Sequence, residues 1–208
     1  MARTVPSGDS GHRFPDFDAL DQARAWDPVT SAVVFDRLAL QPDLRFFGPA
    51  EEAVASALFD LLLAQEGPPE QPRVPVLQMV DSRLAEGQTD GWHYQDMPED
   101  GEAWRRSLHA LDQDARERHG TCFAELTADR QRALVQRVQD LSGERWHDLP
   151  ADRVWSLWTR YACTAFYAHP WAWNEIGFPG PAYPRGYLRL GVGVRERWEH
   201  PDRAPEAP

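Results

Sequence analysis

The chain has 208 residues, of which 42% are hydrophobic and 26% are charged, and its formal net charge is −11. This length suffices for one domain that buries roughly 70% of the surface of the unfolded chain, and the composition is typical of soluble globular proteins. The negative charge opposes binding to nucleic acid or to an anionic membrane surface, and no apolar run approaches the roughly 20 residues that span a bilayer.

Taken in chain order, the sequence predicts six helices between two polar tails, 1–13 and 201–208, which we expect to be disordered. A capping residue followed by proline is typical of a helix start, and glycine is typical of a helix end. Gly87 and Gly120 are expected to end the third and fourth helices. The six helices are expected to begin at or next to Pro28, Pro49, Pro75, Glu102, Thr127 and Ala151.

The last of these helices, 151–168, is the most aromatic, and its apolar residues cover more than one face. This pattern is typical of a helix that is central or shared between two surfaces. The segment 187–194 is the only strand candidate, and a lone strand needs a partner. We therefore predict an all-α protein, a single helical domain of about six helices over residues 14–200. Its N-terminal arm is irregular, and its C-terminal arm is rich in proline, glycine and aromatic residues.

The sequence contains no convincing motif for a cofactor or a metal. The segment LGVGVRE has Glu196 where a dinucleotide fingerprint needs its third glycine, and no βαβ pattern surrounds it. The spacings typical of zinc and covalent haem sites are also missing. Cys122 and Cys163 are expected to be reduced thiols in the core, with one disulfide as the alternative.

The best arrangement for acid–base catalysis is His93 with Asp90 and Asp96, in a polar loop that also holds Trp92 and Tyr94. Carboxylates are common in turns, however, and this explains the two aspartates at least as well as catalysis does. His109 is expected on the surface, and His169 is expected to mark a helix end. We therefore predict no catalytic, cofactor-binding or metal-binding residue in this chain.

The segment 161–187 contains four Tyr, two Trp, two Phe, four Pro and three Gly. Aromatic side chains offer large, rigid contact areas, and proline and glycine preset the backbone. Trp155, Trp158 and Phe166 are expected in the core, whereas residues 169–190 are expected to form a ribbon that docks on a partner. The partner-binding residues that we predict are Trp92, Tyr94, Tyr167, Pro170, Trp171, Trp173, Ile176, Phe178, Pro179, Pro181, Tyr183, Arg185 and Tyr187.

The order of residues in FYAHPWAWNEIGFPGPAYPRGY resembles the C-terminal signature of the gluconate 2-dehydrogenase subunit 3 family. In that signature a helix ends in Y-x-x-P-x-x-W-x-x-I/L-G-Y/F-P-G-P, and a Pro-Arg-Gly-Tyr turn follows. The likeness extends more loosely over residues 27–190. The matching positions are Tyr167, Pro170, Trp173, Ile176, Gly177, Phe178, Pro179, Gly180 and Pro181, with Pro184, Arg185, Gly186 and Tyr187 as the turn.

The resemblance implies an accessory role. Small subunits of this family accompany a large flavoprotein of the glucose–methanol–choline (GMC) type, often with a cytochrome c subunit. We therefore expect a non-catalytic small subunit that binds and stabilises a FAD-dependent GMC-type sugar or polyol dehydrogenase, or assists its maturation. FAD is expected on that partner and not in this chain, and we expect neither nucleic-acid binding nor membrane insertion.

Location and two other classes of function follow from the same residues. The N-terminal residues 1–17 contain neither an apolar segment nor a twin-arginine pair, so we expect a cytoplasmic location, with export on a signal-bearing partner as the alternative. A stand-alone carbohydrate-binding protein or small oxidoreductase would use Trp92, His93, Tyr94 and the C-terminal aromatics as a platform. A chaperone would differ from a subunit only in the lifetime of the complex.

Overall fold

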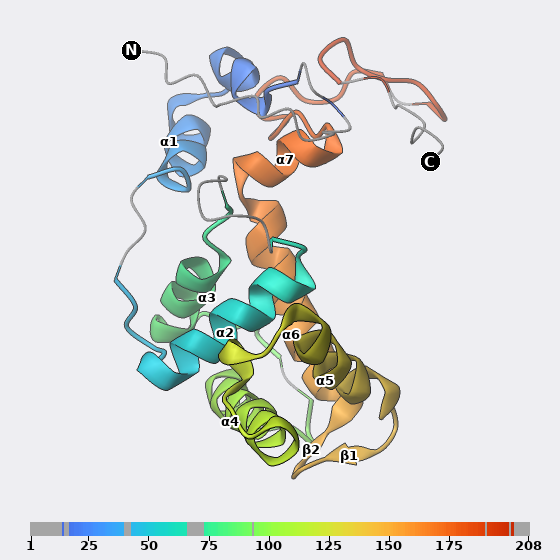
Figure 1. Ribbon diagram of the computed structural model, residues 1–208. Helices are drawn as coiled ribbons and strands as arrows, with labels where there is room; N and C mark the ends of the chain where they lie inside the picture. The colour runs from blue at the N-terminus through green and yellow to red at the C-terminus, as the bar shows by residue number, and fades with distance from the viewer. Residues whose placement is uncertain are drawn as a thin grey trace. The chain divides into compact units, whose positions relative to one another are not determined.

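The computed structural model describes residues 14, 17–39, 43–65, 73–92, 94–189, 191–199 and 201 (Figure 1). Residues 1–13 and 202–208, the greater part of the two expected tails, lie outside this described part. The chain divides into two compact units: unit 1 comprises Met1–Leu40 and Tyr167–Pro208, and unit 2 comprises Gln41–Phe166. The described residues are mostly helical, which confirms the predicted all-α class, whereas the expected domain limits of 14–200 stay a prediction.

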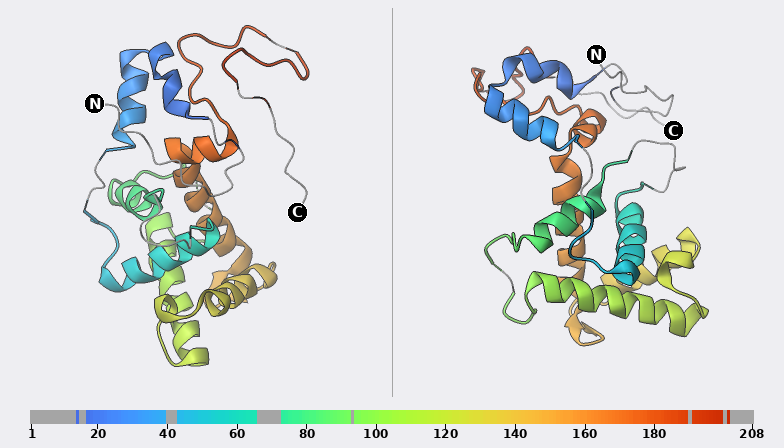
Figure 2. Two further views of the ribbon diagram at one scale, coloured as in Figure 1. Left: turned by 45° about the horizontal axis from the view of Figure 1, so that its top comes forward. Right: turned by 90° about the vertical axis from the view of Figure 1, so that its left-hand side faces the viewer.

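Unit 2 contains the middle of the chain, and five of the six predicted helices begin there. In this unit α2 contacts α3, α4, η2 and α5, α4 is the longest helix that the structure describes, and one short hairpin follows α5 (Figure 2). The elements are α2 (Pro49–Leu62), α3 (Val76–Ala85), α4 (Asp100–His119), η2 (Phe123–Glu125), α5 (Ala128–Asp140), β1 (Arg145–Trp146), β2 (Leu149–Pro150) and α6 (Ala151–Ala168), the last two residues of which belong to unit 1.

Aromatic side chains from several helices form the core of unit 2. Trp104 is fully buried, and its ring meets Phe59 at a centroid distance of 5.4 Å and Tyr161 at 5.8 Å. Trp158 is also fully buried, and its Nε1 donates a hydrogen bond of 3.0 Å to the hydroxyl of Ser107. The predicted core position of Trp158 is therefore confirmed, while Trp155 and Phe166 are only half-buried.

A buried carboxylate fixes the segment that leads into α2. Asp81, on α3, has no exposed surface, and its oxygens accept the backbone N–H groups of Arg45 at 2.7 Å, Phe46 at 2.9 Å and Phe47 at 2.8 Å. Three consecutive amides that no helix or strand satisfies are thus paired by one side chain. This carboxylate holds the ring of Phe47 against Trp104, at a centroid distance of 6.1 Å.

Unit 1 joins the two ends of the described chain. Its elements are η1 (Ala19–Ala25), α1 (Pro28–Asp36) and α7 (Pro170–Ile176), and η1 lies beside α7 in both views (Figures 1 and 2). The helix start expected at Pro28 is confirmed, and Asp27 caps this helix by accepting the N–H of Thr30 at 2.6 Å. The sequence did not predict η1 or α7, because each is a short element in a segment rich in turn-forming or aromatic residues.

One short element was not predicted, and one further prediction is wrong. The described residues of 187–194, the strand candidate that we set aside for want of a partner, form no strand. A hairpin that the sequence did not predict lies at 145–150, where Trp146 and Leu149 face each other and are both buried. The two cysteines are free thiols, as expected, but neither is a core residue: Cys163 is exposed and Cys122 is half-buried. Cys163 belongs to a helix that is apolar on more than one face, so its neighbours in sequence did not reveal its orientation.

Candidate functional site

The C-terminal motif, residues 167–187, is built around α7. His169 is the N-cap of this helix, and its Nδ1 accepts the N–H of Trp171 at 3.2 Å. Gly177 ends the helix at a φ of +66°, which only glycine adopts freely, and Phe178 donates its N–H to the carbonyl of Trp173 at 2.9 Å. A proline at the first helical position and a glycine at the end thus explain why the motif contains a helix where we expected a ribbon.

Part of the motif is buried in unit 1 itself. Trp173 is 4% exposed and packs with Ala19, Trp26 and Val34 from the N-terminal segment. Its Nε1 donates to the carbonyl of Tyr167 at 2.7 Å, so its polar atom is satisfied inside the unit. These contacts give Trp173 a structural role, because they bring together segments more than 130 residues apart.

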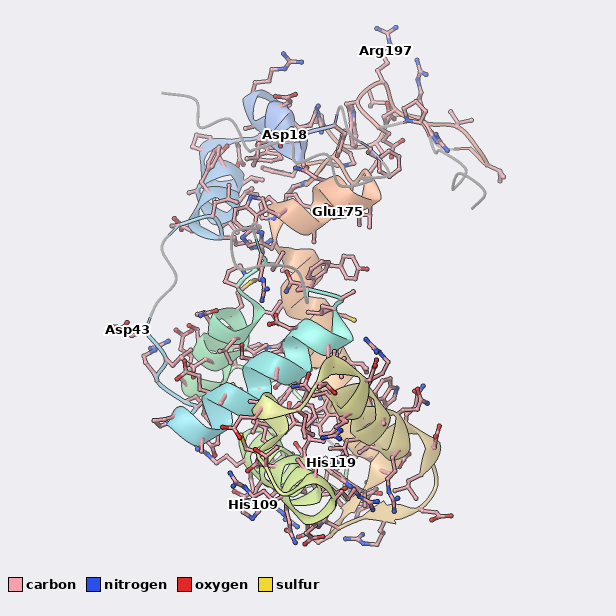
Figure 3. The ribbon with its side chains drawn as sticks, viewed as in Figure 1. Asp18, Asp43, His109, His119, Glu175 and Arg197 are labelled. Carbon is pink, nitrogen blue, oxygen red and sulfur yellow. The ribbon has the colours of Figure 1, made fainter. Side chains whose placement is uncertain are left out.

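The glycine in the Pro-Gly-Pro stretch belongs to the same core. A Cβ atom on Gly180 would lie 2.7 Å from the ring of Trp26, and the residue has a φ of +77°. No side chain can replace this glycine without displacing a tryptophan. In the same unit, Ala19 donates its N–H to the side-chain oxygen of Asn174 at 2.8 Å, and Asp18, labelled in Figure 3, caps η1. Part of the motif therefore stabilises the fold of unit 1.

The other part of the motif is exposed. The predicted partner-binding residues that lie buried in unit 1 are Pro170, Trp173 and Pro179, and those that are half-buried are Trp171, Pro181 and Arg185. The exposed ones are Tyr167, Ile176, Phe178, Tyr183 and Tyr187. Contact of any of these residues with a partner stays a prediction.

Exposed apolar side chains gather in unit 1. Of the twelve large hydrophobic residues that are exposed in the described part of the chain, eleven belong to unit 1, and Trp92 is the twelfth. Unit 1 is the smaller unit, so its surface is apolar out of proportion to its size. Exposed apolar side chains that lie together mark binding sites in soluble proteins, so unit 1 is the candidate binding unit of the described chain.

A buried histidine lies at the centre of unit 1. His169 is 1% exposed, and Arg37 donates to the neighbouring carbonyl of Ala168 at 2.8 Å. Burial lowers the pKa of His169 to about 4; a hydrogen bond with the backbone of Arg37 acts against this shift, and the positive charge of Arg37 adds to it. The imidazole is therefore neutral at physiological pH, as its role as acceptor for Trp171 requires.

This histidine makes the stability of unit 1 depend on pH. Its pKa lies below the unfolded value of about 6.5, so the unfolded chain binds the proton more readily, and stability falls as the pH drops from about 6.5 towards 4. Over this whole pH range the free energy of unfolding falls by about 3 kcal/mol. In His169→Asn the amide oxygen keeps the cap, and we expect the variant to lose this part of the pH dependence. Melting temperatures of both proteins across that range test it, and parallel curves would contradict it.

The loop that holds Trp92 and Tyr94 lies in unit 2, where arginines fix it. The carboxylate of Asp90 forms ion pairs with both Arg83 and Arg160, and the guanidinium of Arg153 lies 3.9 Å from the centroid of the Tyr94 ring. Asp96 lies 3.8 Å from Arg153. His93, the third member of the expected acid–base group, lies outside the described residues. Both aspartates of that group thus pair with arginines that hold the loop.

A small polar cavity of about 180 Å³ lies beside this loop. Asp100 lines it and is almost fully buried, and its carboxylate accepts the hydroxyl of Tyr161 at 2.6 Å and lies 3.6 Å from Arg160. Burial and this hydrogen bond raise the pKa of Tyr161, and burial lowers the pKa of Arg160. Both groups keep their usual protonation at neutral pH. The cavity is lined by Thr89, Gly91, Trp92, Glu99 and Asp100.

Neither a metal site nor a membrane-spanning helix is found within the described ranges. No three His, Cys, Asp or Glu side chains come together there in a way that could hold a metal ion. None of the helices described is both long and apolar enough to cross a bilayer. His109 is exposed on α4, as predicted, and Figure 3 shows that it lies apart from His119 on the same helix.

The described residues define a mostly helical protein with an aromatic C-terminal motif, and its exposed apolar side chains lie chiefly in unit 1. A family model described as gluconate 2-dehydrogenase subunit 3 matches residues 49–180, which is more than half of the chain. The chain therefore belongs to the gluconate 2-dehydrogenase subunit 3 family. No curated protein and no solved structure matches it.

Proposed function

We propose that this chain is the non-catalytic small subunit of a FAD-dependent GMC-type dehydrogenase of a sugar or polyol, and that it binds and stabilises the large flavoprotein subunit or assists its maturation. The observation that supports this most is the concentration of exposed apolar side chains in unit 1. In this proposal FAD and the catalytic groups belong to the large subunit, and a cytochrome c subunit can join the complex. The complex resides in the cytoplasm unless the partner carries an export signal.

In this proposal some motif residues stabilise unit 1, and others contact the large subunit. Trp173 and Gly180 stabilise unit 1, and Tyr167, Ile176 and Phe178 are exposed on it, where they contact the large subunit in this proposal. Aromatic and aliphatic anchors on a rigid support lose little entropy when they bind. A compact unit made from both chain ends thus presents its apolar side chains in one fixed arrangement.

Co-expression with the flavoprotein large subunit encoded in the same genome tests this proposal. We expect the two chains to co-elute in size-exclusion chromatography and the flavoprotein to lose solubility or FAD when expressed alone. Tyr167→Ala and Ile176→Ala are both exposed changes on helices, and each is expected to weaken the complex about tenfold. Val29→Ala on α1 is the control, because it changes an exposed valine of the same unit outside the motif. A flavoprotein that is soluble, fully active and unassociated without this chain would refute the proposal.

One observation favours a second candidate function. The cavity beside Trp92 combines an aromatic side chain with the carboxylates of Glu99 and Asp100, a combination suited to a small polyhydroxylated molecule. In this alternative the chain binds a saccharide on its own. Calorimetric titration of the purified chain with glucose and with gluconate distinguishes the two candidates, because only the second expects heat of binding without the flavoprotein.

A further inference from the structure

A closed loop follows the family-matched region. Its described residues are 187–189 and 191–199, and we call it the C-terminal loop. Glu196 is 9% exposed, and its carboxylate accepts the N–H groups of Leu188, at 2.5 Å, and of Arg189. The rings of Tyr187 and Trp198 meet at the base of the loop, with a centroid distance of 5.2 Å. The two ends of the loop are thus held together without a helix or strand.

The loop is anchored on the rest of unit 1. The guanidinium of Arg185 lies 3.8 Å from the centroid of the Trp198 ring, and it also donates to the side chain of Gln22 on η1 at 3.0 Å. At the tip, Val194 donates its N–H to the carbonyl of Gly191 at 3.1 Å, which forms a turn. The base is therefore tied to unit 1, and the tip has a defined turn.

The loop exposes three apolar side chains, Leu188 near its base and Val192 and Val194 at its tip. Leu188 is 85% exposed, and Val192 is fully exposed. Val194 is about half exposed. Other loops of the described chain expose single aromatic residues, but none exposes three aliphatic side chains so close in sequence. Side chains held in this way are in position to enter a partner without reordering of the loop.

Positive charge surrounds this apolar tip in a chain whose net charge is −11. Arg189, Arg195 and Arg197 are all exposed, and the side chain of Arg197 points away from the unit (Figure 3). The two acidic residues of the loop are engaged by its backbone: Glu196 binds the amides of Leu188 and Arg189, and Glu199 accepts the N–H of Glu196 at 2.7 Å. The exposed surface of the loop is therefore basic and apolar.

We propose that the C-terminal loop inserts Leu188, Val192 and Val194 into an apolar pocket of the large subunit, and that carboxylates at the rim of that pocket pair with Arg189, Arg195 and Arg197. This proposal rests on the proposed function and adds a contact outside residues 49–180. A protein pocket fits better than a lipid surface, because the rest of this acidic chain would be repelled by anionic lipid. The loop also exposes too few apolar side chains for stable membrane anchoring.

The double variant L188S/V192S tests the apolar part of this contact. With the wild-type complex as reference, we expect the dissociation constant for the large subunit to rise at least about tenfold. The melting temperature of the free chain should stay unchanged, because both side chains are exposed. The control V29S removes a valine of α1 that is also exposed, at 73%, and should bind like wild type.

The triple variant R189Q/R195Q/R197Q tests the charged part. Raising the salt concentration from about 50 to about 300 mM should weaken the wild-type complex more than the triple variant, because salt screens exposed ion pairs. Glu196→Ala should weaken binding several-fold with the tip unchanged, whereas Glu196→Gln keeps one accepting oxygen and should bind nearly as well as wild type.

The outcomes separate the two proposals. If the wild-type chain does not bind the large subunit, the proposed function fails. If the wild-type chain binds and L188S/V192S binds equally well, only the proposal for the loop is overturned. Binding of the free wild-type chain to phosphatidylcholine vesicles that contain phosphatidylglycerol, with loss of that binding in L188S/V192S, would also overturn it, since the loop would then contact lipid.

Discussion

Replacing Trp173 by alanine is expected to destabilise unit 1 by about 4 kcal/mol, which is the usual cost of removing a buried tryptophan. The side chain fills the space between α7 and the N-terminal segment, against Trp26 and Val34, and donates its only hydrogen bond to the carbonyl of Tyr167. The variant loses these contacts together and leaves a cavity that this small core cannot close. Chemical denaturation followed by tryptophan fluorescence and by hydrogen exchange measures the loss.

Tyr183→Ala is the control for this experiment, because Tyr183 is also an aromatic residue of the motif but is 64% exposed. We expect its stability to change by less than about 0.5 kcal/mol. Gly180→Ala should also destabilise unit 1, since the added Cβ would displace Trp26. If Trp173→Ala leaves unit 1 protected from hydrogen exchange, the structural role given to this residue is wrong. Loss of partner binding in that case would make it a contact residue instead.

The second large effect is expected in unit 2, where Asp81→Ala should cost about 4 kcal/mol. The carboxylate accepts three consecutive backbone N–H groups, at Arg45, Phe46 and Phe47, and the variant leaves all three without this acceptor. Each buried donor that loses its partner costs about 1–3 kcal/mol. The entry to α2 should open and expose Phe47, so urea denaturation should show a lower midpoint.

Asp81→Asn sharpens the test. The amide keeps one oxygen but turns an N–H group toward the backbone donors, so we expect a smaller loss, about 2 kcal/mol. Asp43→Asn makes the same change at an exposed residue a few positions away and should be neutral (Figure 3). Equal stability of the Asp81 and Asp43 variants would show that the capping carboxylate is not needed.

Trp173 and Asp81 show that the sequence did not reveal the structural role of either residue. Trp173 stood out in the sequence, and we predicted that it contacts a partner; the structure buries it at the junction of the two chain ends. Asp81 did not stand out, because an aspartate in an amphipathic helix is usually solvated. Its role depends on three amides more than 30 residues away, and no local pattern records such a contact.

Helix positions and family membership followed from the sequence by itself. Apolar periodicity, prolines at first helical positions and glycines at helix ends are local signals, so the six predicted helices all exist and the range of α6 is as expected. The order of residues in the C-terminal motif pointed to the family that the comparison confirmed. Both kinds of information are carried by residues close together in the chain.

Only the tertiary structure decided which motif residues support unit 1 and which face solvent. Burial depends on what packs against a residue, and here the packing residues come from the opposite end of the chain, as with Trp26 on Gly180. The same holds for the C-terminal loop, where Glu196 lies in the place of a missing glycine in the sequence but closes a loop in the structure. The sequence indicated that aromatic residues gather near the C-terminus. Long-range contacts determined which of them remain available to a partner.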